Sequence, residues 1–308
     1  MTIQQEAGVS PQNAAPLAAE KKLRSQSLAG RAFRRFLKHR LAVISSIFMI
    51  TVVLLVFPLA PVVAPIPPNK IILTEVGQPP SAAHWLGTDL TGRDVWSRVI
   101  YGGRVSVAVG LVAVTIYMSI GTLLGSIAGY FGGRTDAFIM RVTDTVMAFP
   151  VLVILISIVA IVGPGLINAM LAIGLIGWTG VARLVRGQVL SIRETDFITA
   201  ARAIGAPRSQ IILRHILPNV VAPITVAASF GIAGAILTEA GLSFLGLGVQ
   251  VPTPSWGNML NEAQSIAILE DYLWLWIPPG LMISLCVLAI NFIGDGLRDA
   301  LDPRMTLD

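Results

Sequence analysis

The sequence predicts an all-α polytopic membrane protein with six transmembrane helices. Its mean hydropathy is +0.75, and only 13% of its 308 residues are charged, whereas soluble domains carry about 25%. Six apolar runs are long enough for the roughly 20 helical residues that cross the hydrocarbon core of a bilayer. These runs lie near residues 41–63, 104–129, 142–163, 166–186, 221–246 and 273–296.

The segment before the first apolar run, residues 1–40, predicts a basic N-terminal tail. Its first half is rich in Ala, Gln and Pro without an apolar pattern, so we expect disorder there. Its second half is basic, and the spacing of Arg31, Phe33 and Phe36 indicates an interfacial helix. A polybasic tail can bind RNA, but directly before an apolar run it is more typical of a topology anchor. We therefore expect contact with membrane lipid and no nucleic-acid partner.

The distribution of arginine and lysine predicts the orientation in the membrane. Eight basic residues precede the first run, and others follow the second and fourth runs or lie in the C-terminal tail at 297–308. The loops after the third and fifth runs have none. Because basic residues favour the cytoplasmic side, we expect both termini there. The loop after the first run carries basic residues against this rule, but the eight upstream should outweigh them.

That loop, residues 64–103, is the longest predicted outward segment, and the first transmembrane helix at 41–63 leads into it. The apolar spacing after Asp94 indicates a short interfacial helix near its end. Asp89, Arg93 and Asp94 either contact a ligand or partner or form a structural clasp, and we favour the clasp.

The other five spans form a core at residues 104–296. Gly121, Gly125 and Gly129 recur every fourth residue in its first span, so they share one helix face. Small residues let membrane helices approach closely and gain van der Waals contact. We therefore expect this glycine face to pack against another helix.

The polar segment at residues 190–219 predicts a helix, a glycine corner and a second helix between two apolar runs. Asp196 or the preceding threonine is a suitable N-cap, and Gly205 suits a helix C-terminus because it tolerates positive φ. Pro207 suits the first turn of the second helix, and Pro218 is expected to end it. This shape fits a peg that another protein grips.

The motifs of several enzyme classes are absent from the sequence. No lysine follows glycine as in a P-loop, the three histidines are far apart, and no G-x-S-x-G occurs. The single Cys286 excludes an intrachain disulfide. Asp144 and Glu239 are the carboxylates nearest the membrane interior, where a charge marks function by default. For Glu239 a translocation-path role and a hydrogen-bonded structural strut stay equally open.

The polar segment resembles the cytoplasmic loop of ABC-importer permeases, whose signature is E-A-A, three residues, Gly, nine residues and I-x-L-P. Thr199-Ala200-Ala201, Gly205 and Leu217-Pro218 match, whereas Thr199 replaces the Glu and His215 replaces the Ile. Longer stretches resemble the second permease subunit of dipeptide and oligopeptide ABC importers: HWLGTDLTGRDVWSRVIYGGR, AGYFGGRTDAFIMRVTD, LSFLGLGVQVPTPSWGNML and FIGDGLRDALDPR.

This resemblance implies a type I ABC importer transmembrane domain in the bacterial inner membrane, with residues 64–103 in the periplasm. It also implies a heterodimer with a homologous permease, one or two ABC ATPase subunits that use ATP and Mg, a periplasmic substrate-binding protein and a peptide substrate. The chain itself would be no enzyme and would bind no cofactor. The residues expected to form the ATPase-coupling loop are Asp196, Thr199, Ala200, Ala201, Arg202, Gly205, Pro207, Leu217 and Pro218.

Two alternatives remain open from the sequence, and a third is not supported. The same architecture could import glutathione or a nickel chelate instead of a peptide. A self-sufficient secondary transporter would need paired ionisable groups at the membrane midplane, and the sequence offers few. An intramembrane enzyme lacks support from any motif.

Overall fold

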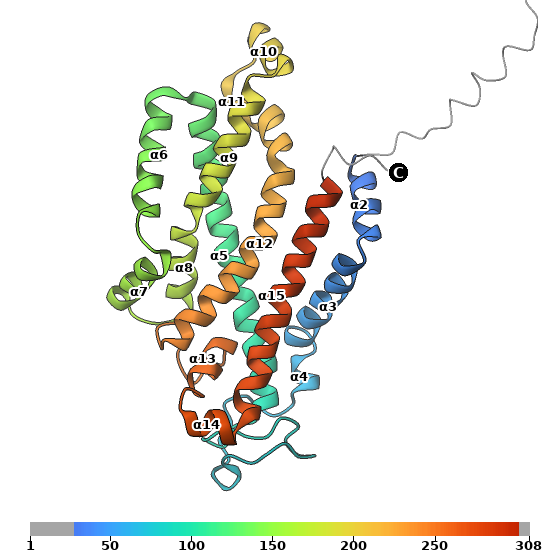
Figure 1. Cartoon of the computed structure of the whole chain (residues 1–308), viewed down its shortest axis with the longest axis vertical. Coiled ribbons are helices and arrows are strands. Elements are labelled where there is room, and N and C mark those ends of the chain that lie inside the picture. The colour runs from blue at the N-terminus through green and yellow to red at the C-terminus, as the bar shows by residue number, and fades with distance from the viewer. Residues whose placement is uncertain (1–27, 302–308) are drawn as a thin grey trace, which may run out of the picture.

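The protein is an elongated bundle of helices in a computed structural model that describes residues 28–301 (Figure 1). The only β-ladder contact within this range is an isolated β-bridge between Thr88 and Asp94. The helices are α2 (Leu28–Lys38), α3 (Arg40–Val56), α4 (Ala60–Val63), η3 (Leu73–Glu75), α5 (Val95–Phe131), α6 (Gly133–Met147), α7 (Val151–Val162), α8 (Leu166–Ile176), α9 (Trp178–Arg193), α10 (Asp196–Ala203), α11 (Arg208–Gln210), η4 (Ile211–Ile216), α12 (Leu217–Phe244), α13 (Trp256–Asn261), α14 (Ile266–Asp271) and α15 (Leu273–Leu301).

The all-α fold class is confirmed, and the apolar helices allow four to six membrane spans. Four continuous helices are long and apolar enough to cross a bilayer: Val95–Phe131, Leu166–Arg193, Arg208–Phe244 and Leu273–Leu301. Two further helix pairs qualify only if each bent pair counts as one span. The six predicted spans are the upper end of this range. The predicted basic helix before the first span is present as α2, whereas residues 1–27 and 302–308 lie outside the described residues.

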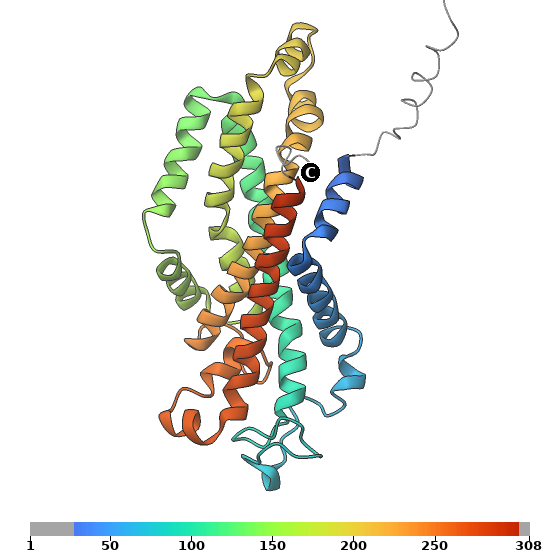
Figure 2. The same cartoon turned by 45° about the vertical axis from the view of Figure 1, so that its right-hand side comes forward.

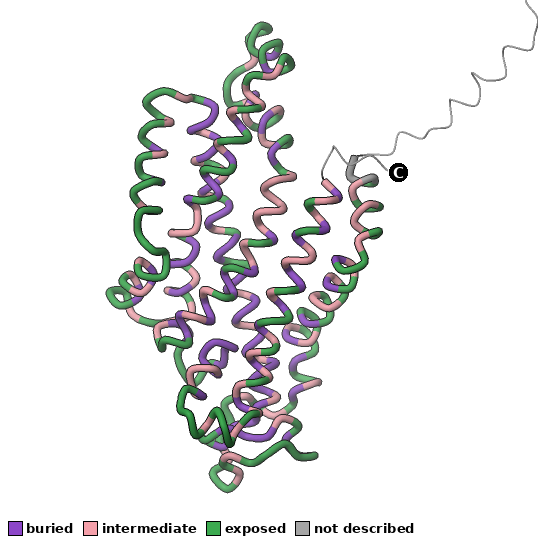
Figure 3. Tube along the Cα trace, viewed as in Figure 1, coloured by how far each residue is buried: buried purple, intermediate pink, exposed green. Residues whose placement is uncertain are grey.

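The long helix α5 forms the centre of the bundle. It packs along α9 on one side and along α12 on another, and α15 covers α12 and α3. In both views α6 and α7 lie on one flank of these helices and α2 and α3 on the opposite flank (Figures 1 and 2). Buried residues recur along the whole length of α5, as Figure 3 shows. This central helix therefore connects the two ends of the molecule.

The predicted glycine face is the contact surface between α5 and α9. A Cβ atom added to Gly121 would lie 2.6 Å from Val181 Cβ, and one added to Gly125 would lie 2.5 Å from the Ala182 carbonyl oxygen. Gly129 approaches Val189 in the same way, at 2.8 Å. The glycines thus allow close packing within one chain.

The prediction of a short interfacial helix near the end of residues 64–103 is wrong. That segment forms the first turns of α5, which begins at Val95 and continues without a break. Asp94 caps it by accepting a hydrogen bond from the Ser97 amide at 2.7 Å. The helix continues through Gly102 and Gly103, and the absence of side chains there lets the backbone of Ser255 and the ring of Trp256 approach closely.

The predicted third span, residues 142–163, is not one straight helix. The chain leaves α6 after Met147 and enters α7 at Val151, and the two helices are bent by 84°. Pro150 lies at this break, where it disfavours helical geometry at Phe149 and itself occupies the N-cap of α7. Hydropathy alone could not locate this bend.

Proline also acts differently from the prediction at residue 218. Pro218 does not end the second helix of the polar segment, because it lies in the first turn of α12. The six residues that precede α12, Ile211–Ile216, form a wide π turn. A proline that follows such a turn lies at a helix start, where its missing N–H is tolerated. The backbone therefore continues from residue 208 to residue 244 as one span.

Candidate functional site

The polar segment forms a peg at one end of the molecule, built from α10, the Gly205 corner, α11 and η4 (Figure 1). Thr195 occupies the N-cap position of α10, but its hydroxyl donates to the Ile192 carbonyl at 2.6 Å instead of capping the helix. Asp196 is exposed in the first turn, where a carboxylate interacts favourably with the helix dipole. The predicted helix start is thus correct, although the Thr195 side chain makes no hydrogen bond that caps the helix.

The inner face of α10 packs against the bundle. Ile198 is fully buried and Ala201 is 7% exposed, and both belong to a core cluster with Ile211 and Ile216. Ala201 therefore faces the chain's own core, whereas Ala200 is exposed. Of these two expected coupling-loop residues, only Ala200 is therefore placed to contact another protein.

Gly205 forms the corner of the peg. Its φ is +79°, as expected for a helix-terminating glycine, and no heavy atom lies within 4 Å of the position that a Cβ would take. Its amide donates to Arg202 O at 3.0 Å, and the next amide donates to Ala201 O at 3.1 Å. Pro207 then precedes α11 as its N-cap residue. The corner is therefore fixed by backbone conformation alone.

The outer face of the peg is apolar. Phe197 is 48% exposed, Ile204 is 85% exposed and Leu213 is 63% exposed. Thr199 is exposed beside them, and its hydroxyl turns back to Thr195 O at 3.3 Å. Phe197 and Ile204 lie outside the helices that could span a membrane, and apolar groups exposed in such a place are typical of a protein-docking surface.

Arginine side chains connect the peg to the end of α5. The Arg202 guanidinium lies 5.6 Å from the centre of the Tyr130 ring and donates to Arg193 O at 3.4 Å. Arg193 donates to Gly129 O at 3.2 Å, at the last turn of α5. Arg208 lies 5.8 Å from the centre of the Phe131 ring. A cation over an aromatic face is attracted to it, so these contacts couple the position of α10 to that of α5.

The two predicted intramembrane carboxylates lie in different surroundings. Glu239 is fully buried, and its two oxygens accept hydrogen bonds from Ser106 at 3.0 Å and Ser243 at 2.7 Å. It therefore joins α12 to α5. Asp144 on α6 is exposed and accepts from Arg183 on α9 at 2.7 Å. The structure does not bring Glu239 and Asp144 together with the peg.

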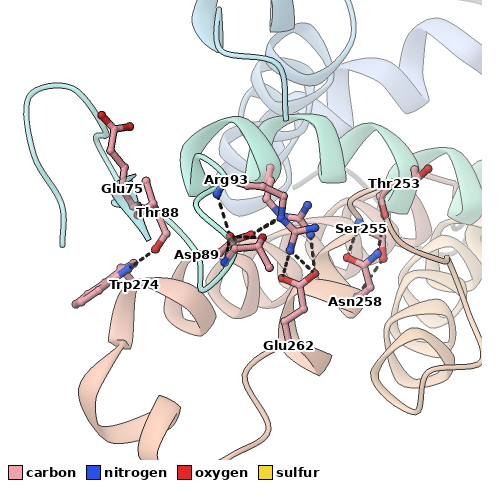
Figure 4. Close-up of polar contacts among 11 residues, drawn as sticks. Glu75, Thr88, Asp89, Arg93, Thr253, Ser255, Asn258, Glu262 and Trp274 are labelled. Atoms are coloured by element: carbon pink, nitrogen blue, oxygen red, sulfur yellow. Dashed lines mark hydrogen bonds and ion pairs between the residues drawn. The ribbon is translucent and has the colours of Figure 1, made fainter. Parts of the chain in front are cut away.

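At the end opposite the peg, four charged residues form a cluster that we call the clasp: Asp89, Arg93, Arg98 and Glu262. Arg93 donates through Nε to Asp89 at 2.6 Å and through Nη2 to both Glu262 oxygens at 3.0 Å (Figure 4). Arg98, which is 1% exposed, donates to Glu262 at 2.8 Å. Burial alone would raise the pKa of Asp89, but hydrogen bonds from the Arg93 amide and from Thr91 outweigh it and lower the pKa.

A second polar contact lies beside the clasp. Asp94 is part of it, because its carboxylate both caps α5 and contacts His84 at 2.8 Å, while the other ring nitrogen of His84 lies 3.0 Å from Glu75. Burial opposes the charged form of His84, but the hydrogen bonds with Asp94 and Glu75 prevail and raise its pKa.

Sequence reasoning missed Glu262 and His84 as members of this region. Glu262 follows α13, far along the chain from Arg93, so no local spacing connects them. The sequence feature that could have indicated such a partner was the presence of arginines in the outward loop, because buried arginines need carboxylate partners. His84 gave no local signal of this role, because its two carboxylate partners lie nine and ten residues away in the sequence.

These features define a class: a membrane-embedded helical bundle with a projecting peg at one end and a cluster of paired charges at the other. More specifically, the chain belongs to the family of binding-protein-dependent transport system inner membrane components, whose model matches residues 121–307. A model of the N-terminal transmembrane domain of oligopeptide transport permease C matches residues 27–80. The chain is thus a permease subunit of an ABC importer.

Individual relatives agree with this assignment. The chain is 45% identical over 280 residues to a dipeptide transport system permease protein of Alkalihalophilus pseudofirmus, with 89% of each chain covered. It is 42% identical over 273 residues to a glutathione transport system permease protein of Pectobacterium atrosepticum, covering 89% of this chain and 90% of that protein. A solved chain of the MetNI methionine ABC transporter, in inward-facing conformations, shares the fold with a TM-score of 0.52 and 20% identity, covering 66% of this chain and 96% of that one.

Proposed function

We propose that this permease subunit forms half of a translocation pathway for di- or oligopeptides in the bacterial inner membrane. Its partners would be a homologous permease, one or two ABC ATPase subunits that use ATP and Mg, and a periplasmic substrate-binding protein that delivers the cargo. ATP hydrolysis would take place in the ATPase subunits. The peg and both termini would lie in the cytoplasm and the clasp in the periplasm. The dipeptide permease relative supports the cargo class.

The observation that carries this proposal is the construction of the peg. Its outer face exposes Phe197 and Ile204, while its inner face is anchored through Ile198 and Ala201. A docking element that transmits motion needs an exposed contact surface and a buried anchor. Without the anchor, the element would shift by itself and the membrane helices would not move. The peg is therefore suited to fit a cleft of an ATPase subunit.

Two routes lead from the peg into the membrane helices. One is the contact of Arg202 with the Tyr130 ring, which lies at the cytoplasmic end of α5 in the proposed orientation. The other is the continuous backbone through η4 into α12. Both α5 and α12 extend toward the end of the molecule that holds the clasp. Displacement of the peg by closure of the ATPase subunits would therefore move both helices along their length.

The test uses two glycines with matched geometry at opposite ends of the molecule. Gly205 has φ +79° and Gly246 has φ +77°, and neither has a heavy atom within 4 Å of an added Cβ. A β-branched residue tolerates positive φ poorly, so Gly205→Val and Gly246→Val impose the same backbone strain. Complexes that carry each variant are purified and reconstituted with the ATPase and the binding protein.

We expect Gly205→Val to remain inserted and paired with the second permease but to lose ATPase co-elution and ATP-driven peptide uptake. Gly246→Val should retain ATPase co-elution. If Gly205→Val keeps wild-type ATPase binding and uptake, the peg is not the coupling element. Uptake by the wild-type complex without ATP would instead support a secondary transporter.

Glutathione is the second candidate cargo, because a glutathione permease is among the relatives. Competition between labelled dipeptide and glutathione for uptake by the wild-type complex separates the two. Preferential uptake of glutathione would change the cargo and leave the coupling mechanism intact.

A further inference from the structure

A cavity of about 410 Å³ opens beside the clasp. All four clasp residues line it, together with Thr91 and five apolar side chains: Leu90, Val95, Val251, Met259 and Leu275. The cavity therefore combines an apolar passage with a charged floor, which is the usual composition of a ligand pocket.

Arg98 is the incompletely paired group in this cavity. Its side chain is buried, and its Nη2 atom donates to Glu262 at 2.8 Å. Its Nε atom lies 3.6 Å from Asp89, too far for a hydrogen bond. Among residues 28–301, neither Nε nor Nη1 of Arg98 meets a hydrogen-bond acceptor. Buried donors are rarely left in this state in native proteins.

The nearby carboxylates are already occupied. Asp89 accepts hydrogen bonds from the amide and hydroxyl of Thr91 and from the amide and Nε of Arg93. Glu262 accepts from both Arg93 and Arg98. The clasp thus has surplus donors although its formal charges cancel. The missing partner is an oxygen acceptor.

We propose that this cavity is a docking pocket for a glutamate or glutamine side chain of the substrate-binding protein. A carboxylate or carboxamide oxygen would pair with Arg98, and the two methylene groups of the stem would pass the apolar wall. Leu90 and Val251 are 42% and 63% exposed, and both lie outside the candidate spans. The rim is therefore suited to a protein partner, and the inference rests on the proposed use of a binding protein.

The test closes the pocket without touching its ion pairs. Val251→Trp places a large ring at the exposed rim, and Val251→Ala is the matched control because it leaves the rim open. Arg98→Lys keeps a cation near Glu262 but removes the guanidinium donors. The affinity of the binding protein, with and without bound peptide, is measured for each whole transporter in nanodiscs, together with its ATPase activity without binding protein.

We expect Val251→Trp and Arg98→Lys to weaken docking by about tenfold or more, because the acceptor loses its buried partner. Val251→Ala should dock like the wild type, and the ATPase activity without binding protein should be unchanged in both Val251 variants. Unchanged docking by Val251→Trp would overturn the proposal even if Arg98→Lys fails to fold. A loss seen only with peptide-loaded protein would also overturn it, since the acceptor would then belong to the cargo. Failure of the proposed function would instead appear as absent ATP-driven uptake in the wild type.

Discussion

The Nδ1 atom of His84 lies 2.8 Å from the carboxylate of Asp94, the residue that caps α5. The opposite ring nitrogen faces Glu75 at 3.0 Å. With a carboxylate at each nitrogen, the imidazole is held as a cation that donates on both sides. The long loop before α5 is thus attached to the helix by an ionisable group whose pKa is raised by its two carboxylate partners.

This arrangement predicts a stability that depends on pH. The pKa of His84 is raised in the fold, so its contribution is complete below the unfolded value of about 6.5 and is lost as pH rises through the folded pKa. The pKa of Asp89 is lowered, so its contribution is complete above about 3.9 and is lost as pH falls through the folded pKa. The loop should be most stable between these limits.

Hydrogen exchange of residues 73–94 measures this effect as a function of pH, after correction for intrinsic exchange. Protection should fall above neutral pH in the wild type, and His84→Gln should remove that dependence while leaving the peg unchanged. Equal pH dependence in both proteins would contradict the role assigned to His84.

Glu239 can be tested for the two roles that the sequence left open. Its hydrogen bonds to Ser106 and Ser243 favour the structural strut. Glu239→Gln keeps the shape and an acceptor oxygen, so a strut predicts a folded complex with most of its uptake. Glu239→Ala should destabilise the subunit by about 2–4 kcal/mol, since two buried hydroxyls lose their hydrogen-bond acceptor. Thermal unfolding and peptide uptake are measured together. A folded Glu239→Gln complex without uptake would show that the charge serves the pathway.

Gly125 gives a test of packing between α5 and α9. A Cβ there would lie 2.5 Å from the Ala182 carbonyl oxygen, so Gly125→Leu must push the two helices apart. The loss in unfolding free energy should exceed the roughly 1–3 kcal/mol that is usual for overpacking. We expect a lower unfolding temperature and faster proteolysis of the subunit itself. Gly187→Leu is the control, because Gly187 is on α9 with no heavy atom within 4 Å of an added Cβ. Equal stability of the two variants would contradict the assigned packing.

Much of the fold was predictable because bilayer thickness imposes a strong pattern on the sequence. The long apolar runs gave the main helices, and the spacing of Gly121 and Gly125 identified a contact face. The start of α5 was missed because hydropathy detects where a run becomes apolar, whereas Asp94 caps the helix in a polar region. The bend at Pro150 was missed because the apolar run continues through it.

The peg was largely predictable and the clasp only partly. Helix caps and positive φ are local properties, so Gly205 could be read from the sequence. The burial of Ala201 against the chain's own core could not be predicted, since it depends on where η4 packs in the bundle. The pairing of Arg93 with Glu262 depends on the tertiary fold, which brings α13 beside the start of α5. Tertiary contacts of this kind leave no spacing signal.

The central claim, that the peg docks an ATPase subunit, is tested most directly by photo-crosslinking from matched aromatic positions. A photoreactive phenylalanine replaces Phe197 on the peg or, as the control, Trp85 near the clasp; these side chains are 48% and 62% exposed. In the assembled wild-type background, illumination at position 197 should give a covalent adduct with the ATPase subunit, and position 85 should give none. An ATPase adduct from position 85, or its absence from position 197 in an assembled complex, would contradict the claim.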